Sequence, residues 1–166
     1  MTNNELNKIA KSKILIIDGA MGTEIQKYNL DENAYRGDIL RNTLHDQKGN
    51  NDILSLTQPN LISDIHMSYC EAGADIIETN TFSSTSIAQT DYGNEKLVYK
   101  MNLASAVIAK NVAIDYQTRK ARIVFVAGAI GPTNKTASMS PDVQDPSYRA
   151  ITFDNLVLSY SESVEA

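Results

Sequence analysis

Three short segments of the chain combine glycine with polar side chains, and each directly follows an apolar run. They are residues 18–23 (Asp-Gly-Ala-Met-Gly-Thr), 78–82 (Glu-Thr-Asn-Thr-Phe) and 131–134 (Gly-Pro-Thr-Asn). The two glycines of the first segment permit positive φ and close backbone approach, so successive N–H groups could hold a carboxylate or another anion. The second segment offers a carboxylate, hydroxyls, an amide and an aromatic ring, and strand geometry turns about half of these toward one ligand.

Each segment also has a purely structural interpretation. Residues 18–23 could form a tight turn that packing alone requires, and Thr and Asn in 78–82 commonly cap the exposed backbone after a strand. Residues 131–134 are an ordinary turn sequence by themselves. Short glycine motifs often arise without function, so both interpretations stay open for each segment on its own.

The elements that must position these segments are three short strands rich in Ile and Val, predicted at 14–18, 75–79 and 123–127. A helix is predicted over 59–73, between Pro59 and a capping Gly73, and another over 94–116 with Asn94 as its cap. A last helix is predicted to begin near Thr152 or Asp154. The alternation of strand and helix predicts a parallel sheet with helices outside, whose ligands bind beyond the carboxyl ends of the strands.

The rest of the chain divides simply. Residues 1–12 are a polar N-terminal extension, residues 13–166 are the folded part, and residues 19–58 are predicted to be a long functional loop. Three parallel strands are too few to close a barrel and would leave apolar edges exposed. The expected fold class is therefore α/β, as the opening part of a larger (β/α) domain.

Composition narrows the classes of function. The chain of 166 residues has a net charge of -5 and no Lys or Arg run, which argues against nucleic acid or an anionic membrane as partner. It has neither a secretory signal nor a membrane span, so a cytoplasmic location is expected. Cys70 is the single cysteine and is interpreted as a small buried hydrophobe. His45 and His66 have no sequence neighbours that would make a triad or a metal pair.

Four segments taken in order resemble a known family. Residues 18–23, 49–59, 71–82 and 131–143 closely resemble the N-terminal homocysteine-binding domain of cobalamin-dependent methionine synthase. The resemblance implies a (β/α)8 TIM-type barrel, of which this chain carries about three βα units. It also implies methyl transfer from methylcobalamin to a homocysteine thiol held on zinc, with folate, cobalamin and activation modules elsewhere in the full-length chain and 5-methyltetrahydrofolate recharging the cobalamin.

The same resemblance implies which residues bind homocysteine. They are Asp18, Gly19, Ala20 and Met21 after the first strand, Asn80, Thr81 and Phe82 after the second, and Gly131 and Asn134 after the third. The three zinc cysteines of the family belong to the later half of the barrel, and Cys70 matches none of them. The chain is therefore expected to be a truncated form that binds neither zinc nor cobalamin and is inactive by itself.

Two alternatives remain at this stage. The first is another homocysteine S-methyltransferase with a different methyl donor, because the betaine- and S-methylmethionine-dependent enzymes share the shorter Asp-Gly and Thr-Phe elements. The second is a small binding module without catalysis, which would fold as a monodisperse protein.

Overall fold

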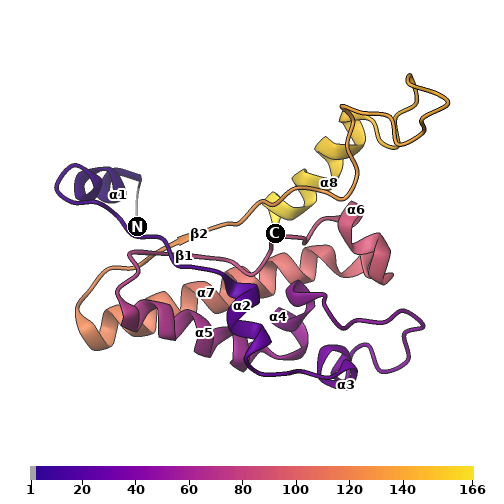
Figure 1. The fold of residues 1–166 in the computed structure, drawn as a ribbon. Coiled ribbons are helices and arrows are strands. Elements are labelled where there is room, and N and C mark those ends of the chain that lie inside the picture. The colour runs from indigo at the N-terminus through magenta and orange to yellow at the C-terminus, as the bar shows by residue number, and fades with distance from the viewer. Residues whose placement is uncertain (1–2) are drawn as a thin grey trace.

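A small parallel sheet organises the fold (Figure 1). The structure is a computed structural model and describes residues 3–166. Strand β1, Ile76–Glu78, pairs in parallel with β2, Phe125–Ala127, so that Ile76 lies opposite Phe125. On the other side of β1, Ile17 makes a single parallel bridge to Ile76. The predicted parallel arrangement is confirmed, and the three polar segments follow the same ends of neighbouring backbone segments.

The prediction of a first strand over 14–18 is wrong. The segment forms the single bridge at Ile17 and a few hydrogen bonds near β1. Among them are the N–H of Asp75 to the carbonyl of Ile16 at 2.7 Å and the N–H of Asp18 to the carbonyl of Ile76 at 2.9 Å. Ile14 is 89% exposed and Ile16 is 59% exposed, so no packing holds the segment flat against the sheet. Strands β1 and β2 are also shorter than predicted, and the sheet within residues 3–166 is open rather than closed into a barrel.

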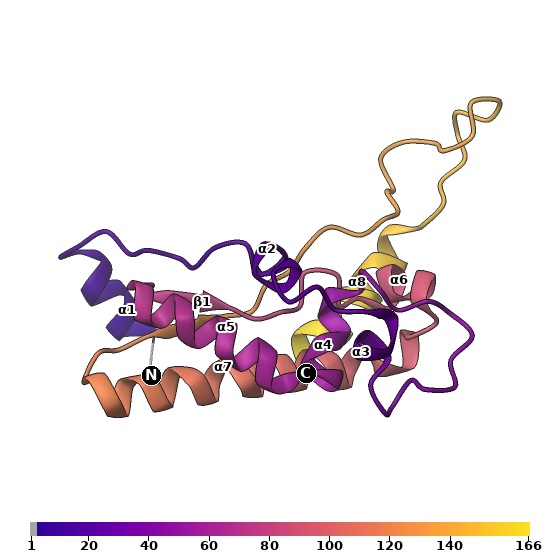
Figure 2. The same cartoon turned by 60° about the horizontal axis from the view of Figure 1, so that its bottom comes forward.

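Two long helices lie side by side against the sheet in Figures 1 and 2. Helix α5, Pro59–Ala72, contacts β1, and helix α7, Val98–Lys120, contacts β2. The prediction of α5 is confirmed, including its cap. Gly73 has a φ of +109°, and its N–H donates to the carbonyls of Tyr69 and Cys70.

The remaining helix predictions differ in accuracy. Helix α7 begins later than predicted, after a 3-10 turn η3, Glu95–Leu97, because Asn94 does not cap it. The Asn94 side chain is buried and donates instead to Oε1 of Gln47 at 2.7 Å. Helix α8, Phe153–Glu165, begins where predicted, since the hydroxyl of Thr152 accepts the N–H of Asn155 at 3.1 Å.

Residues 19–58 are not the long loop that their turn-prone composition predicts. They contain helix α2 (Met21–Gln26), helix α3 (Glu32–Arg36), the 3-10 helix η1 (Asn51–Ile53) and helix α4 (Leu54–Thr57). Their buried apolar side chains join those of α5 and α7 in one core cluster: Ile25, Tyr35, Leu40, Ile53, Leu54, Ile62, Ile65 and Met101. This burial overrides the local turn preferences.

Three further elements complete the description. Helix α1, Asn3–Ala10, lies in the predicted polar extension, while helix α6, Ser86–Gln89, and the 3-10 helix η2, Thr90–Tyr92, precede η3. A second core cluster, which includes Cys70, Ile77, Ala109 and Val124, fills the space between the sheet and α5 and α7. Within residues 3–166 no helix is long and apolar enough to cross a membrane.

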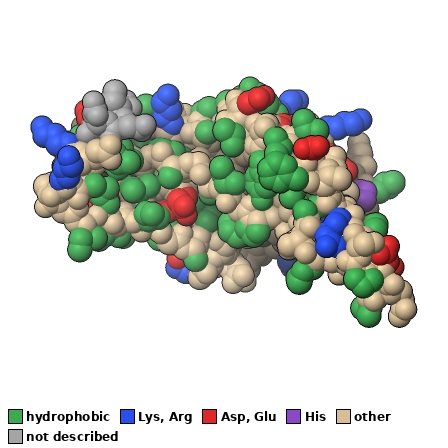
Figure 3. Space-filling view, turned by 90° about the horizontal axis from the view of Figure 1, so that it is seen from above, with side chains coloured by type: hydrophobic (Ala, Val, Ile, Leu, Met, Phe, Trp, Pro, Cys, Tyr) green, Lys and Arg blue, Asp and Glu red, His purple; other side chains and the backbone are tan. Residues whose placement is uncertain are grey.

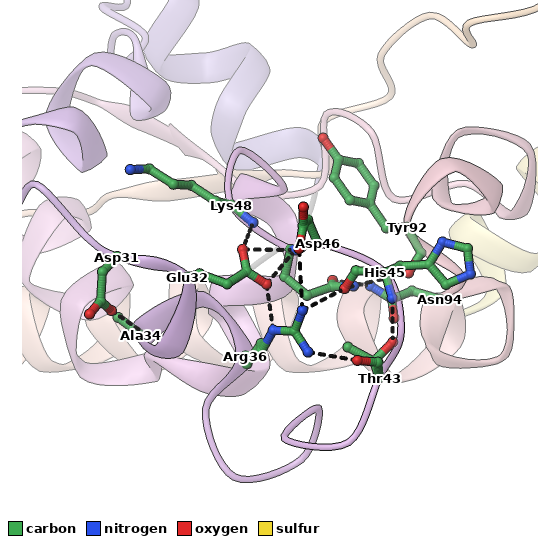
Figure 4. A network of polar contacts seen from close by, with 11 residues as sticks. Asp31, Glu32, Ala34, Arg36, Thr43, His45, Asp46, Lys48, Tyr92 and Asn94 are labelled. Atoms are coloured by element: carbon green, nitrogen blue, oxygen red, sulfur yellow. Dashed lines mark hydrogen bonds and ion pairs between the residues drawn. The ribbon is translucent and has the colours of Figure 1, made fainter.

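The loop between α3 and η1 is held by polar contacts (Figure 4). The carboxylate of Glu32 accepts the N–H of Gln47 at 2.8 Å and that of Lys48 at 2.7 Å. Arg36 donates from Nε to Glu32 at 2.5 Å and from a terminal nitrogen to the carbonyl of Thr43 at 2.6 Å. These charge-assisted bonds fix the point from which the chain enters η1.

Candidate functional site

A cavity of about 430 Å³ lies beyond the carboxyl ends of the strands, and we call it the strand-end cavity. This volume suits a small molecule. Its walls come from the segment before and within α2, from the end of β1 and from the residue group after β2: Asp18, Gly19, Ala20, Met21, Gly22, Glu78, Thr79, Asn80, Phe82 and Ala129. The structure therefore brings together most of the site residues that the sequence predicts.

Asp18 is the charged group whose carboxylate is only partly satisfied in this cavity. One oxygen accepts the N–H of Glu78 at 3.1 Å, whereas Oδ1 is buried without a hydrogen-bond partner. Burial raises the pKa of Asp18 to about 6; the nearby Glu78 carboxylate adds to the rise and the Glu78 N–H opposes it. A buried carboxylate oxygen without a donor is a place where a cationic or hydroxylic ligand gains a hydrogen bond.

The glycines of residues 18–23 act through space rather than through unusual backbone angles. Gly19 and Gly22 do not adopt the positive φ that glycine permits. A Cβ at Gly19 would lie 3.3 Å from the hydroxyl of Tyr69, and one at Gly22 would lie 3.3 Å from the side-chain nitrogen of Asn51. The backbone thus runs close to its neighbours and then enters α2, which begins at Met21 without a side-chain cap.

Asn80 lines the cavity, but its side-chain amide donates hydrogen bonds to other residues of the protein. Its Nδ2 donates to the carbonyl of Asn51 at 2.8 Å and to the hydroxyl of Ser55 at 3.2 Å, and its N–H donates to the hydroxyl of Ser105 at 2.7 Å. The amide nitrogen of Asn80 thus has a structural role, but the backbone that it satisfies belongs to η1 and not to the segment after a strand.

Three predicted site residues lie outside the strand-end cavity. Thr81 donates to the carbonyl of Ala129 at 2.8 Å, and it lines a separate cavity of about 210 Å³ together with Gly131. That cavity is bounded by side chains of α7 and α8. Asn134 lies in the exposed loop between β2 and α8, where its side chain donates to Asp91 at 2.8 Å. This loop projects from the body in Figures 1 and 2.

Asp52 was not predicted from the sequence. It lines a second cavity of about 230 Å³, which shares Met21, Gly22, Asn80 and Phe82 with the strand-end cavity. Its carboxylate accepts the N–H of Ser83 at 2.5 Å and the hydroxyl of Ser84 at 3.2 Å, and burial raises its pKa to about 6. The run Asn50-Asn51-Asp52 reads as a surface turn, so no local signal in the sequence indicates that it is buried.

The described part of the chain does not supply a metal site. Residues 3–166 contain no group of three or more His, Cys, Asp and Glu side chains that could hold an ion. Cys70 is buried in the core, as predicted, and burial raises the pKa of its thiol to about 11. Burial lowers the pKa of His66 to about 4, and neither ring nitrogen has a partner. A zinc ion held by three cysteines does not fit these residues.

Comparison with known proteins gives a consistent result. The family model described as Homocysteine S-methyltransferase matches residues 15–166. The homocysteine methyltransferase MmuM from Escherichia coli is similar in its metallated form, with a TM-score of 0.69 and 20% identity over 96% of this chain, and this likeness shows the fold alone. Its oxidised form matches with a TM-score of 0.61 and 25% identity over 78% of this chain. The matches cover 52% and 41% of those chains, so this chain spans about half of their length.

Proposed function

Because the chain belongs to the homocysteine S-methyltransferase family, which its match over residues 15–166 shows, we propose that it forms part of a homocysteine pocket. The reaction of the whole protein in this proposal is transfer of a methyl group to the thiol of homocysteine, which gives methionine. The residues of this chain bind and orient the amino acid end of the substrate.

The observation that carries the proposal is the unpartnered Oδ1 of Asp18 beside the strand-end cavity. The ammonium group of homocysteine is a cationic donor of the kind that this oxygen lacks, and a charge-assisted hydrogen bond is stronger than a neutral one. The backbone of Gly19, Ala20 and Met21 lines the same cavity and offers N–H groups to the substrate carboxylate. The Phe82 ring offers an apolar wall to the methylene groups.

The methyl donor is the finer part of the proposal. We favour the cobalamin-dependent methionine synthase type, supported by the resemblance of residues 71–82 and 131–143. A homocysteine thiol loses its proton readily when it binds zinc, but residues 3–166 do not supply the ligands for that ion. The alternatives are a related enzyme with another donor and a binding module without catalysis.

Calorimetric titration of this chain with L-homocysteine tests the proposal. We expect binding that zinc does not strengthen, and methionine should bind within a few-fold of homocysteine because Asp18 contacts the end that both share. Asp18→Asn should weaken both by roughly tenfold, because one charge-assisted bond contributes about 1.5 kcal/mol or more. A folded sample that binds neither amino acid would refute the proposal.

Sequencing the transcript beyond the codon for Ala166 tests the donor. Reading frames for cobalamin- and folate-binding modules would support the methionine synthase type. Zinc cysteines followed directly by a stop codon would support a different donor.

A further inference from the structure

Phe82 separates two cavities, and its ring approaches Gly131 closely, since a Cβ added there would lie 2.9 Å from Cγ and Cδ2 of the ring. The ring lines both the strand-end cavity and the cavity beside Asp52, and the residue is 61% exposed. A ring that is solvated on this scale has access to several rotamers. Its position as a wall therefore depends on how the backbone on either side is anchored.

The anchors lie on the segment that contains η1. Before Phe82, the side chain of Asn80 donates to the carbonyl of Asn51 at 2.8 Å. After Phe82, the N–H of Ser83 and the hydroxyl of Ser84 both donate to one carboxylate oxygen of Asp52, at 2.5 and 3.2 Å. The backbone of Phe82 is thus held on both sides by adjacent residues of η1.

Asp52 is buried and is followed by two core residues. The residue is 4% exposed, and Ile53 and Leu54, which follow it, are completely buried in the core. On the opposite side, a Cβ at Gly131 would lie 2.1 Å from the carbonyl oxygen of Phe82, so the chain after β2 approaches this backbone closely. Burial of a carboxylate is costly, and an apolar side chain would fill the same place at less cost to stability.

We propose that Asp52 is a positioning residue for substrate binding: through Ser83 and Ser84 it fixes Phe82 as a wall of the strand-end cavity. The proposal rests on the proposed function for the identity of the ligand, homocysteine. It requires the Asp52 carboxylate to act as an acceptor and not to contact the substrate. Its effect on affinity passes through Phe82.

Two substitutions of Asp52 distinguish loss of the hydrogen-bond acceptor from the effect of replacing the residue. Asp52→Asn keeps an oxygen that accepts both donors, so the Kd for homocysteine should stay within about threefold. Asp52→Ala leaves the Ser83 N–H without its partner, and the Kd should rise roughly tenfold. Equal losses in the two variants, with both folded by circular dichroism, would overturn the proposal.

A double-mutant cycle with Phe82→Ala tests whether Asp52 affects affinity through Phe82. Phe82→Ala removes the wall, and because the side chain is exposed, the fold should persist. In that background Asp52→Ala should weaken binding less than twofold further, whereas a merely structural loss would weaken it equally in both backgrounds. Equal losses would contradict the proposal. If Asp52→Ala does not fold, Ser84→Ala takes its place, with an expected loss of two- to threefold that is likewise absent in Phe82→Ala.

Amide hydrogen exchange separates this proposal from the proposed function. If the unmodified chain does not bind homocysteine, the proposed function fails, but the anchoring of Phe82 is still measurable without ligand. Asp52→Ala should then speed exchange at the Ser83 amide at least tenfold, while Asp52→Asn should leave it nearly unchanged. An unchanged Ser83 rate in Asp52→Ala would overturn the anchoring role.

Discussion

Asp18 links the geometry of the cavity to a pH dependence. Its raised pKa of about 6 means that the carboxylate is charged at pH 7 and becomes protonated below pH 6. The Kd for homocysteine should therefore rise as pH falls from 7 to 5, approaching tenfold per pH unit below the pKa. Calorimetry at pH 7, 6 and 5 measures this. The slope should vanish in Asp18→Asn and persist in Asp52→Asn; a slope that survives in Asp18→Asn would contradict the assignment.

His66 predicts a different response to acid, in stability rather than affinity. The ring is buried without partners and has a lowered pKa of about 4, whereas an unfolded histidine titrates near 6.5. The unfolded state therefore binds the proton first, and the stability present above pH 6.5 is lost as pH falls toward 4. The free energy of unfolding should drop by up to about 3 kcal/mol relative to His66→Leu over this range.

Urea unfolding of both proteins at pH 7, 5.5 and 4.5 measures the difference. Asp18 and Asp52 have raised pKa values and so contribute stability that declines as pH rises from about 4 to 6. They are present in both proteins, and their effects cancel in the comparison. Parallel pH profiles for the two proteins would show that His66 is not the titrating group.

Single residues also mark how far the sequence alone predicts the site. Asp18 follows a recognisable apolar run, so its place beside the sheet was predictable from the pattern, although the run forms a single bridge at Ile17 rather than a strand. The burial of Asp52 was not predictable, because the residue is polar, lies among asparagines and is buried only through the tertiary packing of Ile53 and Leu54. The other carboxylate oxygen of Asp18, Oδ2, accepts the N–H of Glu78, sixty residues away in the sequence, and no local pattern encodes such a contact.

Among the elements, α5 ends on a glycine whose conformation can be tested directly. Gly73 has a φ of +109° and open space around its Cα, so an added methyl group meets no neighbour. Gly73→Ala should lower the free energy of unfolding by about 1 kcal/mol through backbone conformation alone. Gly128→Ala is the matched control, because that glycine is equally open without positive φ. Equal effects in thermal melts of the two variants would contradict this account.

A cluster of charges joins the segment before the Ile17 bridge to both strands. The Asp75 carboxylate accepts from Lys13 at 2.6 Å, from Arg122 at 2.8 Å and from the Ile16 N–H at 3.2 Å, and these groups, Lys13 foremost, lower its pKa to about 2. Its contribution is present above pH 3.8 and lost as pH falls toward 2.

Asp75→Asn should therefore destabilise the protein at pH 7, by about 1–2 kcal/mol, since both cationic partners are partly solvated. Asp38→Asn is the control, because the pair of Asp38 with Arg41 is exposed on both sides and should contribute less than 0.5 kcal/mol. Chemical denaturation at pH 7 compares them. If the two variants lose the same stability, the Asp75 cluster does not stabilise the fold more than an exposed ion pair does.

The elements differ in how well the sequence predicts them, for physical reasons. Helix α5 and helix α8 carry their own boundaries in Pro59, Gly73 and Thr152, so local chemistry predicts them well. The start of α7 depends on Asn94, whose side chain bonds to Gln47 rather than to its own helix. The helices within residues 19–58 are short and are stabilised mainly by burial, which turn propensities do not reveal.

At the scale of the whole molecule, exposed apolar surface predicts self-association. Hydrophobic side chains recur along the face shown in Figure 3. Over the described residues, the exposed large hydrophobic side chains include Ile14 and Ile130. Surfaces of this kind bind other apolar surfaces. Light scattering should show a mass that grows with concentration, and the double variant Ile14→Lys, Ile130→Lys should shift it toward the monomer. A monodisperse monomer at about 100 µM would instead favour a small independent binding module.

The Asp75 cluster lies at the amino ends of the strands, whereas the strand-end cavity lies beyond their carboxyl ends. Changes that strengthen one end of the sheet therefore need not disturb the other. Substitutions near Asp75 can therefore change stability, while substitutions in the strand-end cavity change which ligand binds. A library that varies the surroundings of Lys13 and Arg122 can raise tolerance to heat, and the added tolerance can then absorb destabilising changes around Asp18 and Phe82 that alter which amino acid is bound.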